Sequence, residues 1–397
     1  MTVLTTTLDV ISQLAGIQPG SALAELRMQR PEATGHAQGS YAALFDPDDI
    51  GDLSVDERLA AALRVATLHA AASAAAHYRQ RLAEAGATPD VVTRTAGGAG
   101  VAEVPTRLQA ILRHADLLAV APARARPADL QALADVGLST RAIVTLSQVI
   151  AFVSFQLRVL RGLELLGGLS GGASASSAGE PRPARSTPVA PAPPARIIPR
   201  DKTLRRPTAF TVEQLEWSAW LQPLDLAEAT PRQAAALEGS RANSPYFRLL
   251  ARDIDILTER TATDRGIFYT PGGAPRADRE LSAAATSRFN GCIYCASVHA
   301  RLAAQLGKRP EEIDRLLLRG VAPGTELGLD NRWQGVVDLA VALAPTPPVA
   351  TTQHVAQLRD IGLADLEILD IAQAAAFFAW ANRLMLTLGE PYYPQQA

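Results

Sequence analysis

The chain has 397 residues, which is more than one ordinary domain of about 100–200 residues requires. It carries 38 Lys and Arg against 40 Asp and Glu, and this formal net charge of -2 provides no overall field that would attract nucleic acid or an anionic membrane. We therefore expect no nucleic-acid partner and no membrane partner.

The first residues, "MTVLTTTLDVISQLAG", lack the basic residues that precede the apolar core of a signal peptide. No stretch of the chain approaches about 18 uncharged apolar residues. The sequence therefore predicts a cytoplasmic protein. Because thiols stay reduced in that compartment, two cysteines at C-x-x-C spacing indicate redox or metal chemistry more than a structural disulfide.

Ala and Leu dominate the chain, and its apolar residues recur at intervals of three and four, which predicts an all-α fold. Residues 167–203 are rich in Gly, Ser, Ala and Pro, a composition typical of a flexible linker. This segment divides the chain into an amino-terminal part, residues 1–166, and a carboxyl-terminal part, residues 204–397.

The two parts resemble each other. Residues 136–160 align without a gap on 361–385, and residues 56–77 align without a gap on 278–299. We interpret the chain as a tandem duplication of one helical domain, in which residues 1–166 are a degenerate copy without the C-x-x-C pair. The second alignment places Arg58 opposite Glu280, Ala70 opposite Cys292, Ser73 opposite Cys295 and His77 opposite His299. Since the first copy has no Asn-Gly pair there, we expect one unbroken helix.

The segment "RFNGCIYCASVH", residues 288–299, contains both cysteines. Asn290 and Gly291 tolerate a left-handed backbone, so a helix should end there and a new one should begin at Cys292. The helix dipole would then lower the pKa of thiols in the first turn. His299 follows Cys295 by four residues, which places a base one turn from a nucleophile.

Less specific interpretations remain open for these residues. A zinc site usually needs four N or S ligands, and two cysteines supply half of them. Two thiols in an Ala-rich core can be inert, and a single helical histidine can be a solvated residue. Glu280, taken alone, would be an exposed carboxylate in the first turn of a helix.

Spacing gives these residues a common context. Glu280 is followed by eleven residues, then by Cys292 and Cys295, and after three more residues by His299. This pattern resembles the alkylhydroperoxidase D branch of the carboxymuconolactone decarboxylase family. Residues 362–384 also resemble the closing helix of that family, with a Gly-Leu start and with Asn382 and Arg383 near its end.

The resemblance implies an antioxidant peroxidase that reduces organic hydroperoxides. Cys295 would attack the peroxide and become a sulfenic acid, and Cys292 would resolve it to a disulfide. His299 and Glu280 would relay protons through a bound water. Tyr294 replaces a histidine of the best-known members, and its phenol makes it an auxiliary candidate. No cofactor and no metal is implied.

The same resemblance implies partners and an assembly. The disulfide would be reduced by a dithiol or by a lipoylated protein. Relatives form homo-oligomers, and three fused chains could form a ring of six domains. Two alternatives stay open: a non-redox decarboxylase or hydrolase that acts on a lactone, in a branch that generally lacks the cysteine pair, and a non-enzymatic thiol sensor.

Two aromatic segments receive structural interpretations. Phe377 and Phe378 lie among aliphatic residues at helical spacing, so we expect core or subunit contacts instead of a substrate site. The segment "PYYP", residues 391–394, is interpreted as a tail that docks on a neighbouring molecule.

Overall fold

The computed structural model describes residues 9–97, 104–169 and 192–395. As predicted, these residues form an all-α protein, with one small two-stranded sheet as the exception. The first run of helices is α1 Val10–Leu14, α2 Ala22–Met28, α3 Pro31–Phe45, α4 Val55–Leu68, α5 Ala72–Glu84, α6 Pro89–Ala96, α7 Thr106–Val120, α8 Pro127–Asp135 and α9 Thr140–Gly167, with the 3-10 turn η2 Pro122–Arg124 between α7 and α8. The second run is α10 Pro231–Ala236, α11 Pro245–Leu250, α12 Ile254–Phe268, α13 Arg276–Phe289, α14 Ile293–Gly307, α15 Pro310–Arg319, α16 Asn331–Leu343, α17 Thr352–Asp360 and α18 Asp365–Thr387. The strands are β1 Glu216–Ala219 and β2 Gly389–Tyr392.

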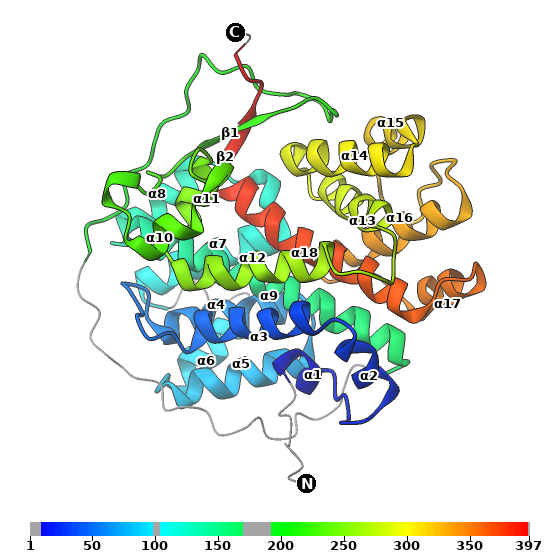
Figure 1. Cartoon of the computed structure of the whole chain (residues 1–397). Helices are drawn as coiled ribbons and strands as arrows, with labels where there is room; N and C mark the ends of the chain where they lie inside the picture. The colour runs from blue at the N-terminus through cyan, green and yellow to red at the C-terminus, as the bar shows by residue number, and fades with distance from the viewer. Residues whose placement is uncertain (1–8, 98–103, 170–191, 396–397) are drawn as a thin grey trace.

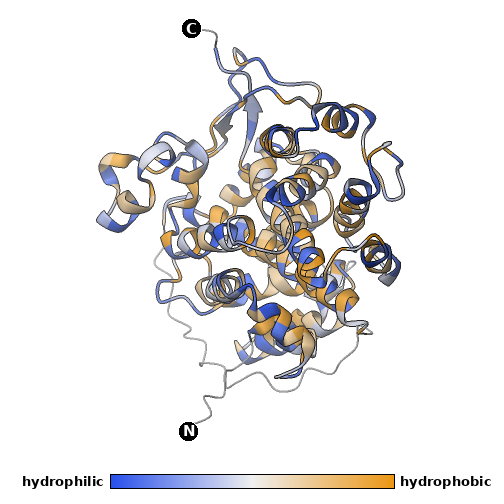
Figure 2. Cartoon of the chain, turned by 45° about the vertical axis from the view of Figure 1, so that its right-hand side comes forward, coloured by the Kyte–Doolittle hydropathy of each residue, from blue (hydrophilic) through white to orange (hydrophobic). Residues whose placement is uncertain are grey.

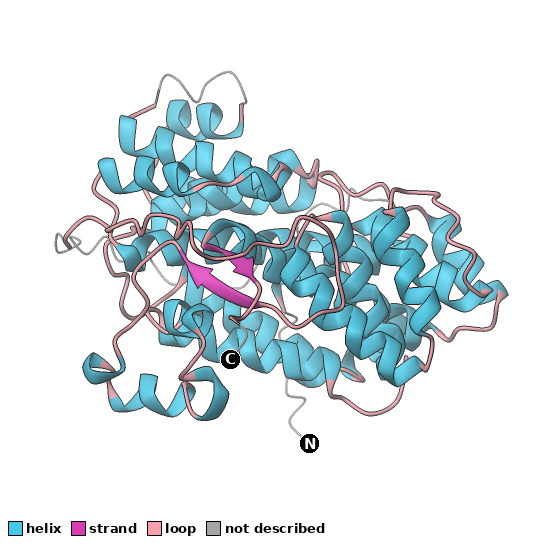
Figure 3. Cartoon of the chain, turned by 90° about the horizontal axis from the view of Figure 1, so that it is seen from above, coloured by secondary structure: helices cyan, strands magenta, loops and turns pink. Residues whose placement is uncertain are grey.

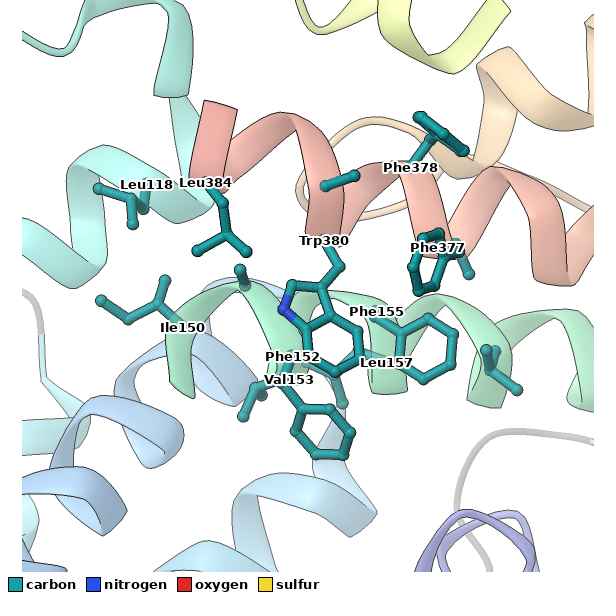
Figure 4. Close-up of a cluster of buried hydrophobic side chains, with 14 of the residues drawn as sticks. Leu118, Ile150, Phe152, Val153, Phe155, Leu157, Phe377, Phe378, Trp380 and Leu384 are labelled. Carbon is teal, nitrogen blue, oxygen red and sulfur yellow. The ribbon is translucent and has the colours of Figure 1, made fainter. Parts of the chain in front are cut away.

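The centre of the molecule is the packing of α9 along α18 (Figures 1 and 4). The indole of Trp380 stacks between Phe152, at 5.2 Å between ring centroids, and Phe155, at 5.5 Å. Its Nε1 donates a hydrogen bond to Oε1 of Gln148 at 2.8 Å, so the one polar atom of the ring is paired inside the core. The two parts of the chain therefore share one hydrophobic core, and they are not separate lobes.

Helix α9 is long and apolar enough to cross a membrane, but its apolar window is entirely buried in the protein. Colouring by hydropathy shows the same arrangement for the surrounding helices, which turn apolar faces inward and polar faces outward (Figure 2). A wholly buried apolar helix is the pattern of a core helix, because its side chains already have apolar neighbours in place of lipid.

A second contact between the two parts is made by α3 and α12, which run side by side (Figure 1). Their backbones approach closely at Gly266, where an added Cβ would lie 2.4 Å from the backbone nitrogen of Ala33. Real Cβ atoms do not approach backbone atoms so closely, so glycine is the residue that permits this contact.

We expect the Gly266→Ala variant to lose about 1–3 kcal/mol of unfolding free energy, because a methyl group forces the α3 and α12 backbones apart. Urea unfolding followed by circular dichroism measures this loss. Gly35→Ala on α3 is the matched control, since nothing lies within 4 Å of its added Cβ. Replacing a helical glycine in open space should be neutral or stabilising by up to about 1 kcal/mol. Equal stabilities for the two variants would contradict the assigned contact.

Helices α3 to α9 and α12 to α18 follow each other in the same order and pack in the same way. In the amino-terminal set, α4 packs against α5, α7 and α9. In the carboxyl-terminal set, α13 packs in the same way against α14, α16 and α18. Contacts across the two runs are reciprocal. Arg158 of α9 donates to the carbonyl of Ala344 at 2.5 Å, and Arg383 of α18 donates to the carbonyl of Ala119 at 2.8 Å.

The structure corrects the expected unbroken helix in the amino-terminal part. Helix α4 ends at Leu68, Ala70 has a φ of 53°, and α5 begins at Ala72, so this part has the same break as α13 and α14. Here an alanine adopts the left-handed conformation at an energetic cost, which the packing of α4 and α5 on the core must offset.

The structure also shows that the residues of α4 and α5 correspond to those of α13 and α14 with a shift of one position from the ungapped sequence alignment. Arg58 of α4 donates to the carbonyl of Leu44, and Arg279 of α13 makes the equivalent bond to Ile267. Arg58 therefore corresponds to Arg279, and it does not correspond to Glu280 as the ungapped alignment suggested. By the same shift, Ala71, Ala74 and Tyr78 stand at the positions of Cys292, Cys295 and His299.

The predicted linker and tail also need correction. Residues 170–191 lie outside the described residues, but the end of the segment is docked: the Ala195 N–H donates to the carbonyl of Leu138, and Ile197 forms a β-bridge with Leu221. The "PYYP" segment docks within its own chain. Strand β2 pairs antiparallel with β1 (Figure 3), and the Arg205 guanidinium lies 3.8 Å from the centre of the Tyr393 ring.

Candidate active site

The cysteines lie at the start of α14, as the sequence predicted: Cys292 precedes the helix and Cys295 is in its first turn. Helix α13 ends at Phe289, Gly291 has a φ of 80°, and Cys292 is the N-cap of α14. An added Cβ at Gly291 would lie 3.0 Å from the Cβ of Ala123 in η2. A segment of the amino-terminal part therefore contacts the cysteine-containing turn at Gly291.

Asn382 of α18 holds this turn in place from the other side. Its Nδ2 donates to the Ser287 hydroxyl at 3.0 Å, and its Oδ1 accepts a hydrogen bond from Nδ2 of Asn290 at 3.0 Å. Both groups lie in the last turn of α13 or at its C-cap. The side chain that the sequence placed in the closing helix thus links α18 to the position of the thiols.

Both cysteines are free thiols and both are buried, with 2 % of Cys292 and 5 % of Cys295 exposed. Burial raises the pKa of the Cys292 thiol well above its usual value, and the adjacent Cys295 adds to this. The nearby N–H of Cys295 and the Asn382 side chain oppose the shift without reversing it. The predicted lowering of the pKa by the helix dipole is therefore wrong for Cys292, because desolvation is the larger effect.

His299 and Glu280 are joined directly, although they lie on different helices. The Nδ1 of His299 is 2.5 Å from Oε2 of Glu280, and the other oxygen of Glu280 accepts from Nε and Nη2 of Arg276, each at 2.5 Å. The Glu280 side chain is completely buried, which excludes an exposed carboxylate at a helix start. Glu280 therefore orients the His299 ring, and Arg276 orients Glu280.

The electrostatics of this triad keep the carboxylate ionised. Burial by itself would raise the pKa of Glu280, but the hydrogen bond and charge of His299, together with those of Arg276, outweigh it and lower the pKa below the usual value. An ionised Glu280 accepts a hydrogen bond from the protonated Nδ1 of His299, which leaves Nε2 as the basic nitrogen.

Aromatic rings enclose the histidine. The His299 ring lies 4.1 Å from the Phe378 ring and 6.1 Å from the Phe268 ring, measured between centroids. Phe377, by contrast, contacts Phe155 in the shared core at 6.3 Å. The predicted core role is therefore confirmed for both phenylalanines, and Phe378 in addition lies against the candidate base.

Tyr294, the auxiliary candidate, is half-buried beside the thiols. Burial raises the pKa of Tyr294, and the two cysteines raise it further, so its phenol stays protonated at neutral pH. No side-chain hydrogen bond of Tyr294 is present in the described part of the chain.

Four residues near the site were missed by sequence reasoning. Arg276 precedes Glu280 by four residues on the same helix, so helical spacing could have identified it. The other three lie in segments that carry no recognisable motif. Tyr246 interacts electrostatically with Arg260 and with both thiols, and Asp264 interacts with Arg260 and with His299. Across residues 9–97, 104–169 and 192–395, no group of three or more His, Cys, Asp and Glu side chains could hold a metal ion.

Comparison with known proteins places the site in a family context. Residues 255–326 match the model of the Carboxymuconolactone decarboxylase family, a range that includes Glu280, both cysteines and His299. A 5'-nucleotidase SurE from Prochlorococcus marinus (strain MIT 9303) is 31% identical over 142 residues, which cover 35% of this chain and 51% of that protein. The chain thus spans about half the length of that curated relative, and we transfer no activity from it.

One solved structure is also similar. It is the alkylhydroperoxidase AhpD core of an uncharacterized peroxidase-related protein from Ralstonia eutropha JMP134, with 23% sequence identity and a TM-score of 0.35. The similarity covers 43% of this chain and 88% of that one.

Proposed function

We propose that this protein, which carries a carboxymuconolactone decarboxylase family segment at residues 255–326, is a thiol-dependent hydroperoxidase acting on organic hydroperoxides. The observation that carries the proposal is a buried pair of free thiols at a helix start, one helical turn from a histidine that a buried carboxylate orients. A purely structural pair of thiols would not require this arrangement.

The proposed reaction uses the two thiols in sequence. The Cys295 thiolate forms an S–O bond with the outer peroxide oxygen, the O–O bond breaks, and the leaving alkoxide takes a proton delivered through His299. The Cys292 sulfur then attacks the sulfenic acid, forms a disulfide and releases water. A dithiol or a lipoylated protein supplies the two electrons that restore both thiols. The raised pKa of Cys292 suits this order, because a protonated thiol does not compete for the peroxide.

We assign a structural role to the amino-terminal part. It repeats the helix order of the carboxyl-terminal part, and alanines stand at the positions of both cysteines. It contributes α9 to the shared core and the contact of Ala123 with Gly291 of the cysteine turn. In this proposal it is a thiol-free copy that supports the active site, and three such chains could assemble into a ring.

The test of the function is to count free thiols after the reduced protein is mixed with cumene hydroperoxide. We expect two thiols per chain to be lost with formation of one alcohol molecule, and turnover to continue when a dithiol is added. No loss of thiol would exclude the peroxidase and return the lactone enzyme as the leading alternative. Loss of thiol without turnover would indicate a sensor.

The proton relay makes a separate prediction. We expect Glu280→Gln to slow reaction of the reduced protein with hydroperoxide at pH 7 by about tenfold or more, because a neutral amide stabilises a protonated His299 less well. Stopped-flow measurement of peroxide consumption tests this. Glu311→Gln, which removes an exposed carboxylate at the start of α15, is the control and should leave the rate unchanged. An unchanged rate in Glu280→Gln would exclude Glu280 from the relay.

The stability of the same pair should depend on pH in one direction. Folding lowers the pKa of Glu280 below its usual value of 4.5, so its contribution to stability is present above that value and is lost as the pH falls through the folded pKa. Wild type and Glu280→Gln should therefore differ in unfolding free energy at pH 7 and converge in more acidic solution.

A further inference from the structure

Among the residues that the structure describes, two buried side chains close to the aromatic rings of the site each carry a polar atom without a hydrogen-bond partner. The first is Tyr246 of α11, which is 7 % exposed and whose hydroxyl makes no hydrogen bond within the described residues. Its ring stacks edge-on against Trp217 at 5.6 Å. Burial raises the pKa of Tyr246, Arg260 opposes this shift, and Cys295 and Cys292 add to it. The phenol remains a protonated hydrogen-bond donor. Aromatic rings connect this region to the candidate base: the Arg260 guanidinium lies 5.0 Å from the Phe377 ring centre, Phe377 packs on Phe268 at 6.3 Å, and Phe268 lies 6.1 Å from the His299 ring.

The second is Arg260 of α12, which is 5 % exposed. Its Nε is buried without a hydrogen-bond partner, and its guanidinium forms no ion pair in the part of the chain that the structure describes. The guanidinium carbon lies 5.7 Å from the Tyr246 ring centre, 5.0 Å from that of Phe377 and 5.7 Å from that of Trp380. Ring faces stabilise a cation only in part, and a buried charge normally has an anionic partner.

Asp264 lies one turn after Arg260 on the same helix. It is not within ion-pair distance of Arg260, and burial raises its pKa, although Arg260 and His299 oppose this shift. The other acidic group of the site, Glu280, is already bound by Arg276 and His299. The positive charge of Arg260 is therefore left without a direct counter-charge.

We propose that Tyr246 and Arg260 form an anion-binding subsite that holds a carboxylate group of the substrate beside the dithiol. Both offer donors, and one guanidinium balances one negative charge, which fits a carboxylate better than a doubly charged phosphate. Resting on the proposed function, this subsite names the substrate class: organic hydroperoxides that carry a carboxylate.

The test uses two alkylating reagents of similar size, iodoacetate, which is an anion, and iodoacetamide, which is neutral. The measured quantity is the ratio of their rates with Cys295 of the reduced protein, followed by peptide mass spectrometry. We expect Arg260→Met to lower the iodoacetate-to-iodoacetamide ratio about tenfold, the change that corresponds to about 1.4 kcal/mol. Tyr246→Phe, which removes one oxygen and preserves packing, should lower it severalfold.

Arg265→Met is the matched control, because Arg265 lies on the exposed side of the same helix, and it should leave the ratio unchanged. An equal ratio in wild type, Arg260→Met and Tyr246→Phe would overturn the subsite. Since Tyr246→Phe keeps the shape of the core, its result counts even if Arg260→Met does not fold. If Arg265→Met lowered the ratio as much as Arg260→Met does, the result would also overturn the subsite, because it would show a general effect of charge.

A second arm links the subsite to turnover. Cumene hydroperoxide and its para-carboxylate differ only in the charged group, and we expect the carboxylate to have the lower KM in wild type and to lose this advantage in Tyr246→Phe. The alkylation ratio does not require peroxidase activity. If the variants lower the iodoacetate-to-iodoacetamide ratio but the wild type does not turn over peroxide, the subsite is retained and the proposed function is rejected. If the wild type turns over peroxide but the variants leave the ratio unchanged, the function is retained and the subsite is rejected.

Discussion

Cys295→Ser is expected to abolish hydroperoxide consumption, with a loss of about a thousandfold or more, as when the nucleophile of an enzyme is removed. A serine hydroxyl is not ionised near neutral pH and cannot form a sulfenic acid, so the first S–O bond never forms. The measurement is peroxide consumption in the presence of excess dithiothreitol.

The control for this variant is its fold. Cys295 is buried, and serine replaces sulfur with a smaller atom at the start of α14, so urea unfolding should show a folded protein with somewhat reduced stability. Full activity in a folded Cys295→Ser protein would show that the sulfur of Cys295 is not the attacking atom.

Cys292→Ser is expected to give about one turnover per chain and then stop, because Cys295 can still attack the peroxide but no neighbouring thiol resolves the product. Rapid mixing should show a burst of alcohol equal to the protein concentration. The accumulated sulfenic acid should react with dimedone and add its mass to the peptide that contains Cys295.

Comparison of the two variants decides which thiol attacks. If Cys295→Ser gave the burst and Cys292→Ser were inactive, the roles would be reversed. The structure favours the assignment made above, since Cys292 is the more completely buried thiol, and burial raises its pKa. A protonated, enclosed sulfur is poorly suited to meet a substrate first. It attacks the sulfenic acid of Cys295 as it loses its proton, which leaves with the sulfenic hydroxyl as water.

Much of the site could be predicted because its residues depend on local structure. The break before Cys292 follows from the backbone freedom of Gly291, and the one-turn separation of Cys295 and His299 follows from the helical repeat. Glu280 was identified by its spacing to the cysteines. Its ion pair with Arg276 has helical spacing as well, so the sequence contained that contact although it was not recognised.

Other features could not be predicted because they depend on packing between distant segments. The break at Ala70 has no glycine to indicate it, and it exists because α4 and α5 must turn over the shared core. The burial that raises the pKa of Cys292 is a property of the packed structure, which no local pattern near the cysteines reveals.

The sequence by itself determined the all-α class, the helix boundaries around the thiols and the residues able to carry redox chemistry. These follow from side-chain period and backbone preference, which act over a few residues. Only the tertiary structure decided that both parts share one core and that, within the described residues, the Tyr246 hydroxyl and the Arg260 Nε are buried without a hydrogen-bond partner. Burial and pairing are properties of neighbours in space, and the packing of α11, α12, α14 and α18 brings those neighbours together.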